Sequence, residues 1–173
     1  MPVANLGVAI SIPEPYAATL SSWREQVGDL EGRRIPPHVT LLPPTEIPAA
    51  ALPEVETHLT AAARTAEPFE MHLSGSGTFR PVSDVVFVVV AAGIAQCEQL
   101  ERQVRRGPLW RETRFPYHPH VTVAHDIDPA GLDAAYDGLA GFEARFRVSV
   151  FTMFAQGSDR VWQPRREFPL GTG

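Results

Sequence analysis

The feature that most constrains this chain is a tetrapeptide, Pro-His-Val-Thr, that occurs twice, at residues 37–40 and 119–122. Apolar residues occupy alternate positions in both copies: Val39 and Leu41, then Val121 and Val123. Such alternation predicts a strand with one face against a core. The fold must therefore contain two similar strands, each with a histidine and a threonine on its other face.

The segments around the two copies follow a similar order, and each copy is followed by an acidic loop and a helix that begins with proline. Strand patterns cover residues 3–12, 69–79, 84–92, 142–156 and 160–168, and helix patterns cover residues 13–30, 48–66, 94–106 and 129–139. This repeat predicts an α+β fold over a single domain, residues 1–173. We expect a bilobal molecule, with two pseudo-twofold-related lobes of antiparallel sheet, helices outside and a central cleft that carries both His-x-Thr motifs.

Composition narrows the class of protein. Of the 173 residues 44% are hydrophobic, which is ample for a packed core, and the single cysteine, Cys97, cannot form an internal disulfide. The chain has no run of eighteen apolar residues and no basic leader, so we expect a cytoplasmic protein without a membrane span.

Charge limits the partners. The formal net charge of −5 argues against a protein that wraps long nucleic acid, because phosphate neutralisation requires a basic surface. A basic region nevertheless precedes the second motif, and it consists of Arg102, Arg105, Arg106, Arg111 and Arg114. We expect the first three to form a solvated helix face paired with glutamates. The region could attract a nucleotide or an RNA end.

The polar faces of the two motif strands suggest a chemistry. Within each motif the histidine and the threonine lie about 7 Å apart along the strand, so both can contact one tetrahedral anion. If the lobes face each other across a twofold axis, His38 and His120 lie on opposite sides of a common cleft. One imidazole can then accept a proton while the other donates one during an in-line displacement at phosphorus. Thr40 and Thr122 would donate hydrogen bonds to the non-bridging oxygens.

With these two motifs the sequence resembles the 2H phosphoesterases, a family that includes bacterial 2'-5' RNA ligase-like proteins and cyclic phosphodiesterases. The resemblance implies a metal-independent phosphodiesterase that hydrolyses a 2',3'-cyclic nucleotide, or a cyclic phosphate at an RNA end, to a phosphomonoester. It implies His38 as general acid and His120 as general base, without any cofactor. It also implies Thr40 and Thr122 as the phosphate binders. A 2'-5' RNA ligase-like activity and a non-catalytic nucleotide- or cyclic phosphate-binding module are the alternatives.

Three residues around the second motif are candidate substrate contacts. Arg114 and Tyr117 belong to the segment "RFPYHPH", which leads into the second strand and could contact a phosphate or a base. His125 stands where many members of the family carry an arginine, five residues after the histidine. Because an imidazole holds a phosphate less firmly than a guanidinium does, this difference favours the binding-module alternative.

A zinc site is a competing interpretation of the second motif. His118 and His120 occupy alternate positions of one strand, and His125 and two aspartates follow. The first copy has no matching second histidine, so the repeated feature is His-x-Thr and we expect no metal. The partner should be a small nucleotide or an RNA end, and a monomer suffices because one chain holds both half-sites.

Other residues are expected to be structural. Two prolines, Pro43 and Pro44, follow the first motif and predict that its strand ends early. His58 and His72 have no evident partner and are interpreted as structural. Four aromatic residues are expected in the core: Trp110, Phe115, Phe154 and Trp162.

Overall fold

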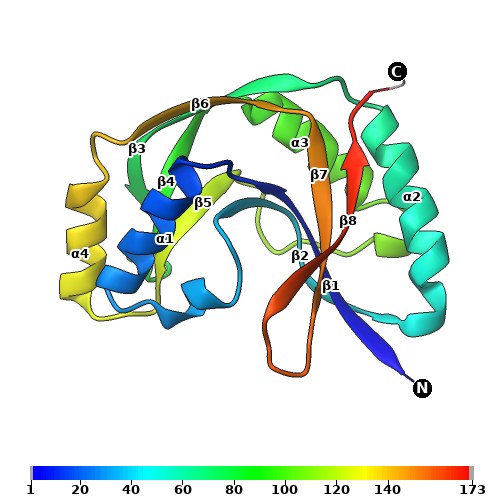
Figure 1. The fold of residues 1–173 in the computed structure, drawn as a ribbon, viewed down its shortest axis with the longest axis horizontal. Coiled ribbons are helices and arrows are strands. Elements are labelled where there is room, and N and C mark those ends of the chain that lie inside the picture. The colour runs from blue at the N-terminus through cyan, green and yellow to red at the C-terminus, as the bar shows by residue number, and fades with distance from the viewer. Residues whose placement is uncertain (1, 172–173) are drawn as a thin grey trace.

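The computed structural model describes residues 2–171 and shows a mixed α+β fold around one antiparallel sheet (Figure 1). The strands are β1 (Val3–Ser11), β2 (His38–Pro48), β3 (Phe69–Thr78), β4 (Val85–Ala92), β5 (His120–His125), β6 (Glu143–Val148), β7 (Val150–Gln156) and β8 (Trp162–Pro169). The α-helices are α1 (Tyr16–Gln26), α2 (Leu52–Arg64), α3 (Ile94–Val104) and α4 (Pro129–Gly138), and short 3-10 turns are η1 (Leu30–Arg33), η2 (Ala49–Ala51) and η3 (Gly107–Leu109). The sheet curls into a half-barrel. No helix in the described part of the chain is long and apolar enough to cross a membrane.

The two motif strands are neighbours at the centre of the sheet. The strand order is β6-β3-β4-β5-β2-β1-β7-β8, and β2 pairs with β5 in antiparallel orientation at Val39 and Val121. These two valines are the equivalent residues of the two motifs, so an approximate twofold axis passes between them. The predicted α+β class and the pseudo-twofold relation of two antiparallel halves are confirmed.

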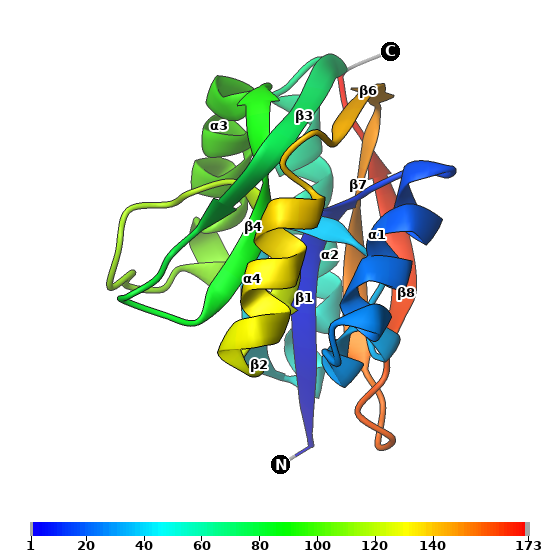
Figure 2. The same ribbon diagram turned by 90° about the vertical axis from the view of Figure 1, so that its left-hand side faces the viewer.

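Each half of the sheet combines both halves of the sequence. Strands β2 and β1 are extended by β7 and β8, and β5 and β4 are extended by β3 and β6. The helices cross over as well: α1 follows β1 but packs against β5, and α3 follows β4 but packs against β2. Figure 2 shows α1 and α4 at the end of the molecule that faces the viewer. The two halves of the sequence are thus interleaved in the fold, and the sequence repeat alone does not predict this.

Both motif strands contain a β-bulge just after the threonine. Opposite β1 the register steps from Thr40 to Leu42, and opposite β4 it steps from Thr122 to Ala124. Two adjacent apolar residues are consequently buried in each strand: Leu41 and Leu42, and Val123 and Ala124. The bulge returns the next residue to the face that carries the histidine and the threonine.

Two strand predictions are wrong. Strand β2 does not end early but continues through Pro43 and Pro44 to Pro48. Both prolines are exposed and lie across from Gly7 at a second irregularity of the β1–β2 register, where no regular ladder bond has to be made. The segment 142–156 forms two strands, because β6 pairs with β3 and β7 pairs with β1. The other predicted elements agree with the structure to within about four residues at each end.

Candidate active site

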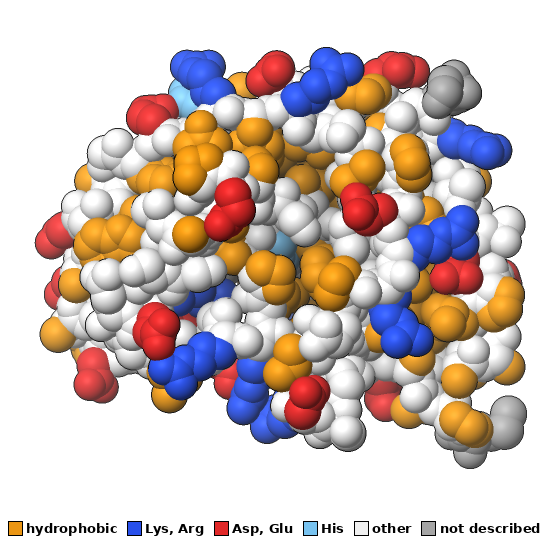
Figure 3. Space-filling view, viewed as in Figure 1, with side chains coloured by type: hydrophobic (Ala, Val, Ile, Leu, Met, Phe, Trp, Pro, Cys, Tyr) orange, Lys and Arg blue, Asp and Glu red, His pale blue; other side chains and the backbone are white. Residues whose placement is uncertain are grey.

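The four motif side chains form one cluster on the polar face of the central strands. Because Val39 pairs with Val121, the register places His38 across from Thr122 and His120 across from Thr40. Directly opposed residues of an antiparallel pair have Cβ atoms about 5 Å apart. Figure 3 shows that the molecule is hollowed near the middle of one face, with a histidine side chain deep in the hollow and hydrophobic side chains around it.

Both histidines are held in the same tautomer by their own strand. Nδ1 of His38 lies 2.8 Å from the carbonyl oxygen of Pro36, and Nδ1 of His120 lies 2.6 Å from the carbonyl oxygen of His118. A carbonyl oxygen can only accept, so Nδ1 is the protonated nitrogen in both rings. Nε2 is therefore the atom that can accept a proton in the neutral ring and donate one in the charged ring.

The surroundings favour the neutral form of both rings. Burial lowers the pKa of His38, against the effect of the bond to Pro36, and the Arg24 guanidinium lowers it further. Burial also lowers the pKa of His120, the bond to the His118 carbonyl opposes this, and the neighbouring imidazoles of His118 and His38 add to the lowering. Since a charge on one imidazole disfavours a charge on the other, the pair takes up a second proton only at lower pH than the first. One acid and one base in the same site is the state that acid-base catalysis requires.

The threonines are available for a ligand, and Tyr117 holds one of them in place. Among residues 2–171 the structure records no protein hydrogen bond to Oγ1 of Thr40 or Thr122, and both residues are half-buried. The Tyr117 hydroxyl donates to the backbone carbonyl of Thr40 at 2.7 Å, and burial raises the pKa of this phenol. Tyr117 thus fixes the strand at Thr40 through its hydroxyl.

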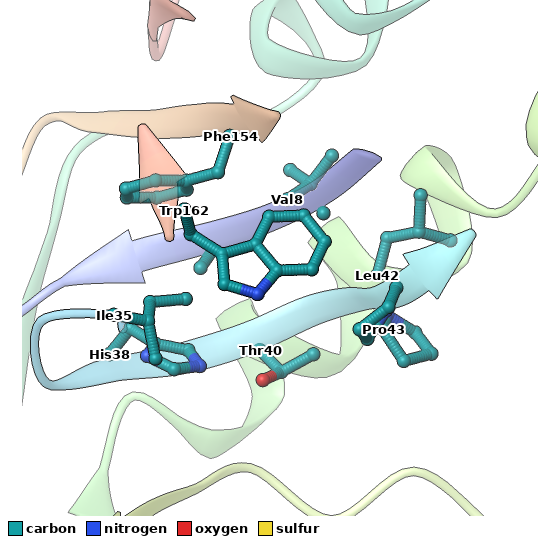
Figure 4. A pocket seen from close by; sticks show the side chains of 11 residues that line it. Val8, Ile35, His38, Thr40, Leu42, Pro43, Phe154 and Trp162 are labelled. Carbon is teal, nitrogen blue, oxygen red and sulfur yellow. The ribbon is translucent and has the colours of Figure 1, made fainter. Parts of the chain in front are cut away.

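An apolar pocket of about 150 Å³ adjoins the first motif. Figure 4 shows the Trp162 indole next to Val8, with His38 and Thr40 along the neighbouring strand. A Cβ atom at Gly7 would lie 3.6 Å from the indole ring, which is an ordinary van der Waals contact. The remaining lining is Ala9, Ile35, Leu42, Pro43, Pro44 and Phe154. A flat heterocycle suits such a pocket.

The surroundings of His120 differ from those of His38. The His120 ring centroid lies 5.0 Å from that of Phe79, 5.3 Å from that of Phe87 and 5.5 Å from that of His118. His120 does not line the apolar pocket. The two imidazoles are therefore equivalent in their strands but not in their neighbours.

The other candidate contacts lie at the margin of the cluster. Arg114 is exposed on the loop that leads into β5. His125 ends β5, on the face to which the bulge returns the chain, and its Nε2 lies 3.2 Å from Oδ2 of Asp126. Within residues 2–171 no group of three or more His, Cys, Asp or Glu side chains is arranged to hold a metal ion.

The predictions for the remaining histidines and aromatic residues have mixed outcomes. His58 contacts the Val104 carbonyl and His72 contacts Glu143, so both have structural partners. Phe154 is buried, as predicted. Trp162 lines the pocket. The prediction of a core position is wrong for Trp110 and Phe115, which are 57% and 70% exposed. Trp162 and Ile35 come from segments that carry no motif, so no local signal identifies them as pocket residues.

Comparisons with known proteins identify the family and agree with the fold. A family model described as the 2'-5' RNA ligase superfamily matches residues 12–160. A protein of Halalkalibacterium halodurans is 30% identical, over 83% of this chain and 79% of its own length. A protein of Bacillus cytotoxicus is 27% identical, over 80% of this chain and 81% of its own length. Both are named "putative phosphoesterase". Among solved structures, E. coli LigT complexed with 3'-AMP has a TM-score of 0.67 at 21% identity, and TT0787 of Thermus thermophilus has 0.64 at 24%. These structures cover 99% and 98% of this chain, with all of each neighbour matched, and show that the fold is shared.

Proposed function

This chain belongs to the 2'-5' RNA ligase superfamily, and from that premise we propose that it is a phosphodiesterase that hydrolyses a 2',3'-cyclic phosphate, on a nucleotide or at an RNA end, to a phosphomonoester. The observation that carries the proposal is the central cluster, in which each histidine lies across from the threonine of the other motif. The phosphoesterase names of the relatives support the reaction class, and the 3'-AMP complex of LigT supports a small nucleotide as ligand.

In the proposed reaction the cyclic phosphate lies between the two motifs. Nε2 of His120 takes a proton from a water molecule while the water oxygen attacks phosphorus. The bond from phosphorus to one ribose oxygen breaks, and the protonated Nε2 of His38 gives its proton to that oxygen. One P–O bond forms and one breaks, and proton exchange with solvent resets the pair. The hydroxyls of Thr40 and Thr122 donate to the non-bridging oxygens, where charge develops. These steps need no metal ion.

The apolar pocket supports this assignment of roles. A base held against Trp162 would bring its ribose close to His38, which lines the same pocket. The imidazole on the ribose side is suited to protonate the leaving ribose oxygen. His120, outside the pocket, is then on the side from which water attacks.

Substitution of the histidines tests the proposal. We expect His38→Ala and His120→Ala each to lower kcat by roughly 10²-fold or more, because each removes one proton transfer. The rates are measured by chromatography on a panel of 2',3'-cyclic nucleotides, with chelator present. The matched control is His72→Ala, which removes a histidine that contacts Glu143 away from the cluster and should retain the wild-type rate. Wild-type turnover by either cluster variant would refute the mechanism.

A leaving-group test separates the acid from the base. A nucleoside phosphodiester with a p-nitrophenolate leaving group needs no protonation of that group. His38→Ala should therefore recover most of its activity on this diester, whereas His120→Ala should remain slow. Recovery by His120→Ala, with His38→Ala remaining slow, would instead make His120 the acid and His38 the base.

Non-catalytic binding is the second candidate function, and one contact favours it. The imidazole of His125, which stands in place of a family arginine, is near Asp126 and is less available to a phosphate. Saturable binding of cyclic nucleotides, with no product detected by phosphorus NMR over hours, would establish binding in place of hydrolysis. Formation of a 2'-5' linkage from a cyclic phosphate end and a 5'-hydroxyl end would instead establish a ligase-like activity.

A further inference from the structure

The loop between α3 and β5, residues 105–119, exposes two large aromatic side chains. Trp110 is 57% exposed and Phe115 is 70% exposed. Each ring is next to an arginine in the sequence, Arg111 and Arg114 respectively. Exposed rings of this size offer flat apolar faces to a ligand.

The same loop is cationic on a chain that is acidic as a whole. Arg106, Arg111 and Arg114 are exposed, and none of them forms a salt bridge within 4.0 Å to a described carboxylate. Arg105, by contrast, is paired with Glu101 at 2.6 Å. The only acidic residue among 105–119 is Glu112. The loop therefore presents positive charge and flat apolar rings together.

The loop is anchored to the motif strands. The Tyr117 hydroxyl donates to the Thr40 carbonyl at 2.7 Å, and Nη2 of Arg111 donates to the Glu46 carbonyl of β2 at 3.4 Å. At its end the His118 ring lies 5.2 Å from that of Phe79 and 5.5 Å from that of His120. Figure 2 shows the loop projecting from the body of the molecule beside the turn between β3 and β4. The loop therefore borders the cluster and contacts both motif strands.

We propose that residues 105–119 bind the nucleotides that precede the terminal one in a single-stranded RNA whose 3'-terminal phosphate lies in the cluster, so that an RNA end is bound in preference to a free mononucleotide. The inference rests on the proposed function, because the phosphate in the cluster fixes where the strand ends. Exposed bases stack on Trp110 and Phe115, and the guanidinium groups neutralise backbone phosphates. Each ring is next to an arginine in the sequence, and rings combined with positive charge suit a nucleic acid strand better than a protein surface. A duplex hides its base faces and cannot stack in this way.

Binding measurements test the proposal without requiring turnover. Fluorescence anisotropy compares a labelled single-stranded RNA of about eight nucleotides, with a 3'-phosphate, against a 3'-phosphorylated mononucleotide as competitor. We expect the oligonucleotide to bind at least about tenfold more tightly, and Trp110→Ala and Phe115→Ala each to weaken it by about tenfold. The affinity for the mononucleotide should not change. Arg106→Gln should reduce the slope of log K against log salt by about 0.7, the contribution of one released counterion on a single strand.

Matched controls remove similar side chains from elsewhere on the surface. Tyr136→Ala deletes an exposed ring on α4, and Arg145→Gln deletes an exposed arginine on β6; both should bind the oligonucleotide as the wild type does. The inference is overturned if the oligonucleotide binds no more tightly than the mononucleotide, if an RNA duplex binds equally well, or if the loop variants match these controls. Hydrolysis of mononucleotides, together with RNA binding that the loop variants do not weaken, would overturn the inference alone. Loop-dependent binding of RNA by a protein that hydrolyses nothing would support the inference and reject the proposed reaction.

Discussion

At the scale of single residues, two identical motifs acquire different chemistry from their neighbours. Both histidines donate Nδ1–H to the carbonyl two residues before them. His38 then lies beside an apolar pocket, whereas His120 lies among the rings of Phe79, Phe87 and His118. The division into acid and base that we propose therefore rests on these different neighbours, because β2 and β5 hold the two rings in the same way.

The lowered pKa values predict an acidic optimum. The base works only when neutral, and a lowered pKa keeps it neutral down to a lower pH, which moves the acidic limb of the profile to lower pH. The acid works only when charged, and with a lowered pKa it loses its proton at a lower pH, which moves the basic limb in the same direction. The bell-shaped profile of kcat/KM, which reports the free enzyme, should thus have its maximum below pH 6.5, the ordinary pKa of histidine. An anionic phosphodiester stabilises charged imidazoles, so the profile of kcat should lie at higher pH.

Steady-state rates across the acid and neutral range measure both profiles, with His118→Asn as an informative variant. Without the His118 imidazole the pKa of His120 rises, so only the acidic limb should move to higher pH. A kcat/KM maximum well above pH 7 in the wild type would contradict the lowered pKa values.

At the scale of elements, a buried ion pair controls the connection from α1 to β2. Nη2 of Arg24 lies 2.7 Å from Oδ2 of Asp29, and the two side chains are 8% and 2% exposed. The other carboxylate oxygen of Asp29 accepts from the Glu31 amide and caps η1. The connection continues to Ile35, a wall of the pocket, and then to His38. Arg24 and Asp29, which do not line the pocket, thereby help to position the segment that leads to His38.

Breaking this pair should destabilise the fold and disturb binding. Arg24→Met leaves the Asp29 carboxylate buried without its partner, and we expect the free energy of unfolding to fall by about 3 kcal/mol. The double variant Arg24→Met with Asp29→Leu should recover most of that loss in urea denaturation. It still lacks the cap of η1, so KM for a cyclic nucleotide should remain raised. Wild-type stability of the single variant, or a wild-type KM of the double variant, would contradict this account.

At the scale of the whole molecule, the interleaved topology makes the two halves dependent on each other. Strand β1 pairs with β7, and β3 pairs with β4 and β6, so each half of the sequence supplies strands to both halves of the sheet. We predict that a chain divided after Val82, in the exposed turn between β3 and β4, yields two fragments that do not fold separately. An equimolar mixture should regain the native circular dichroism spectrum and cyclic phosphodiesterase activity. Dispersed amide signals in the NMR spectrum of either isolated fragment would disprove this dependence.

Sequence patterns predicted the parts that are local and missed those that depend on tertiary contacts. The alternation around Val39 and Val121 is visible along the chain, and so the two strands and the polar face with both histidines could be predicted. The pocket could not, because Trp162 reaches the first motif through tertiary contacts: β7 pairs with β1 and with β8, and the Trp162 amide donates to the Arg34 carbonyl at 2.8 Å. Pro43 led to the wrong prediction that its strand ends early, because the irregular pairing with β1, which tolerates the proline, cannot be read from the local sequence.

The pairing of β1 with β7 also has a consequence for synthesis. Leu6 of β1 lies opposite Ala155 of β7. Every residue from β1 to β7 must leave the ribosome before this edge of β1 can be covered, so the half of the sheet that contains β1 cannot close until β7 has been synthesised. Until then a hydrophobic strand remains open to other nascent chains, and a chaperone that shields the emerging N-terminal segment should raise the yield of native protein.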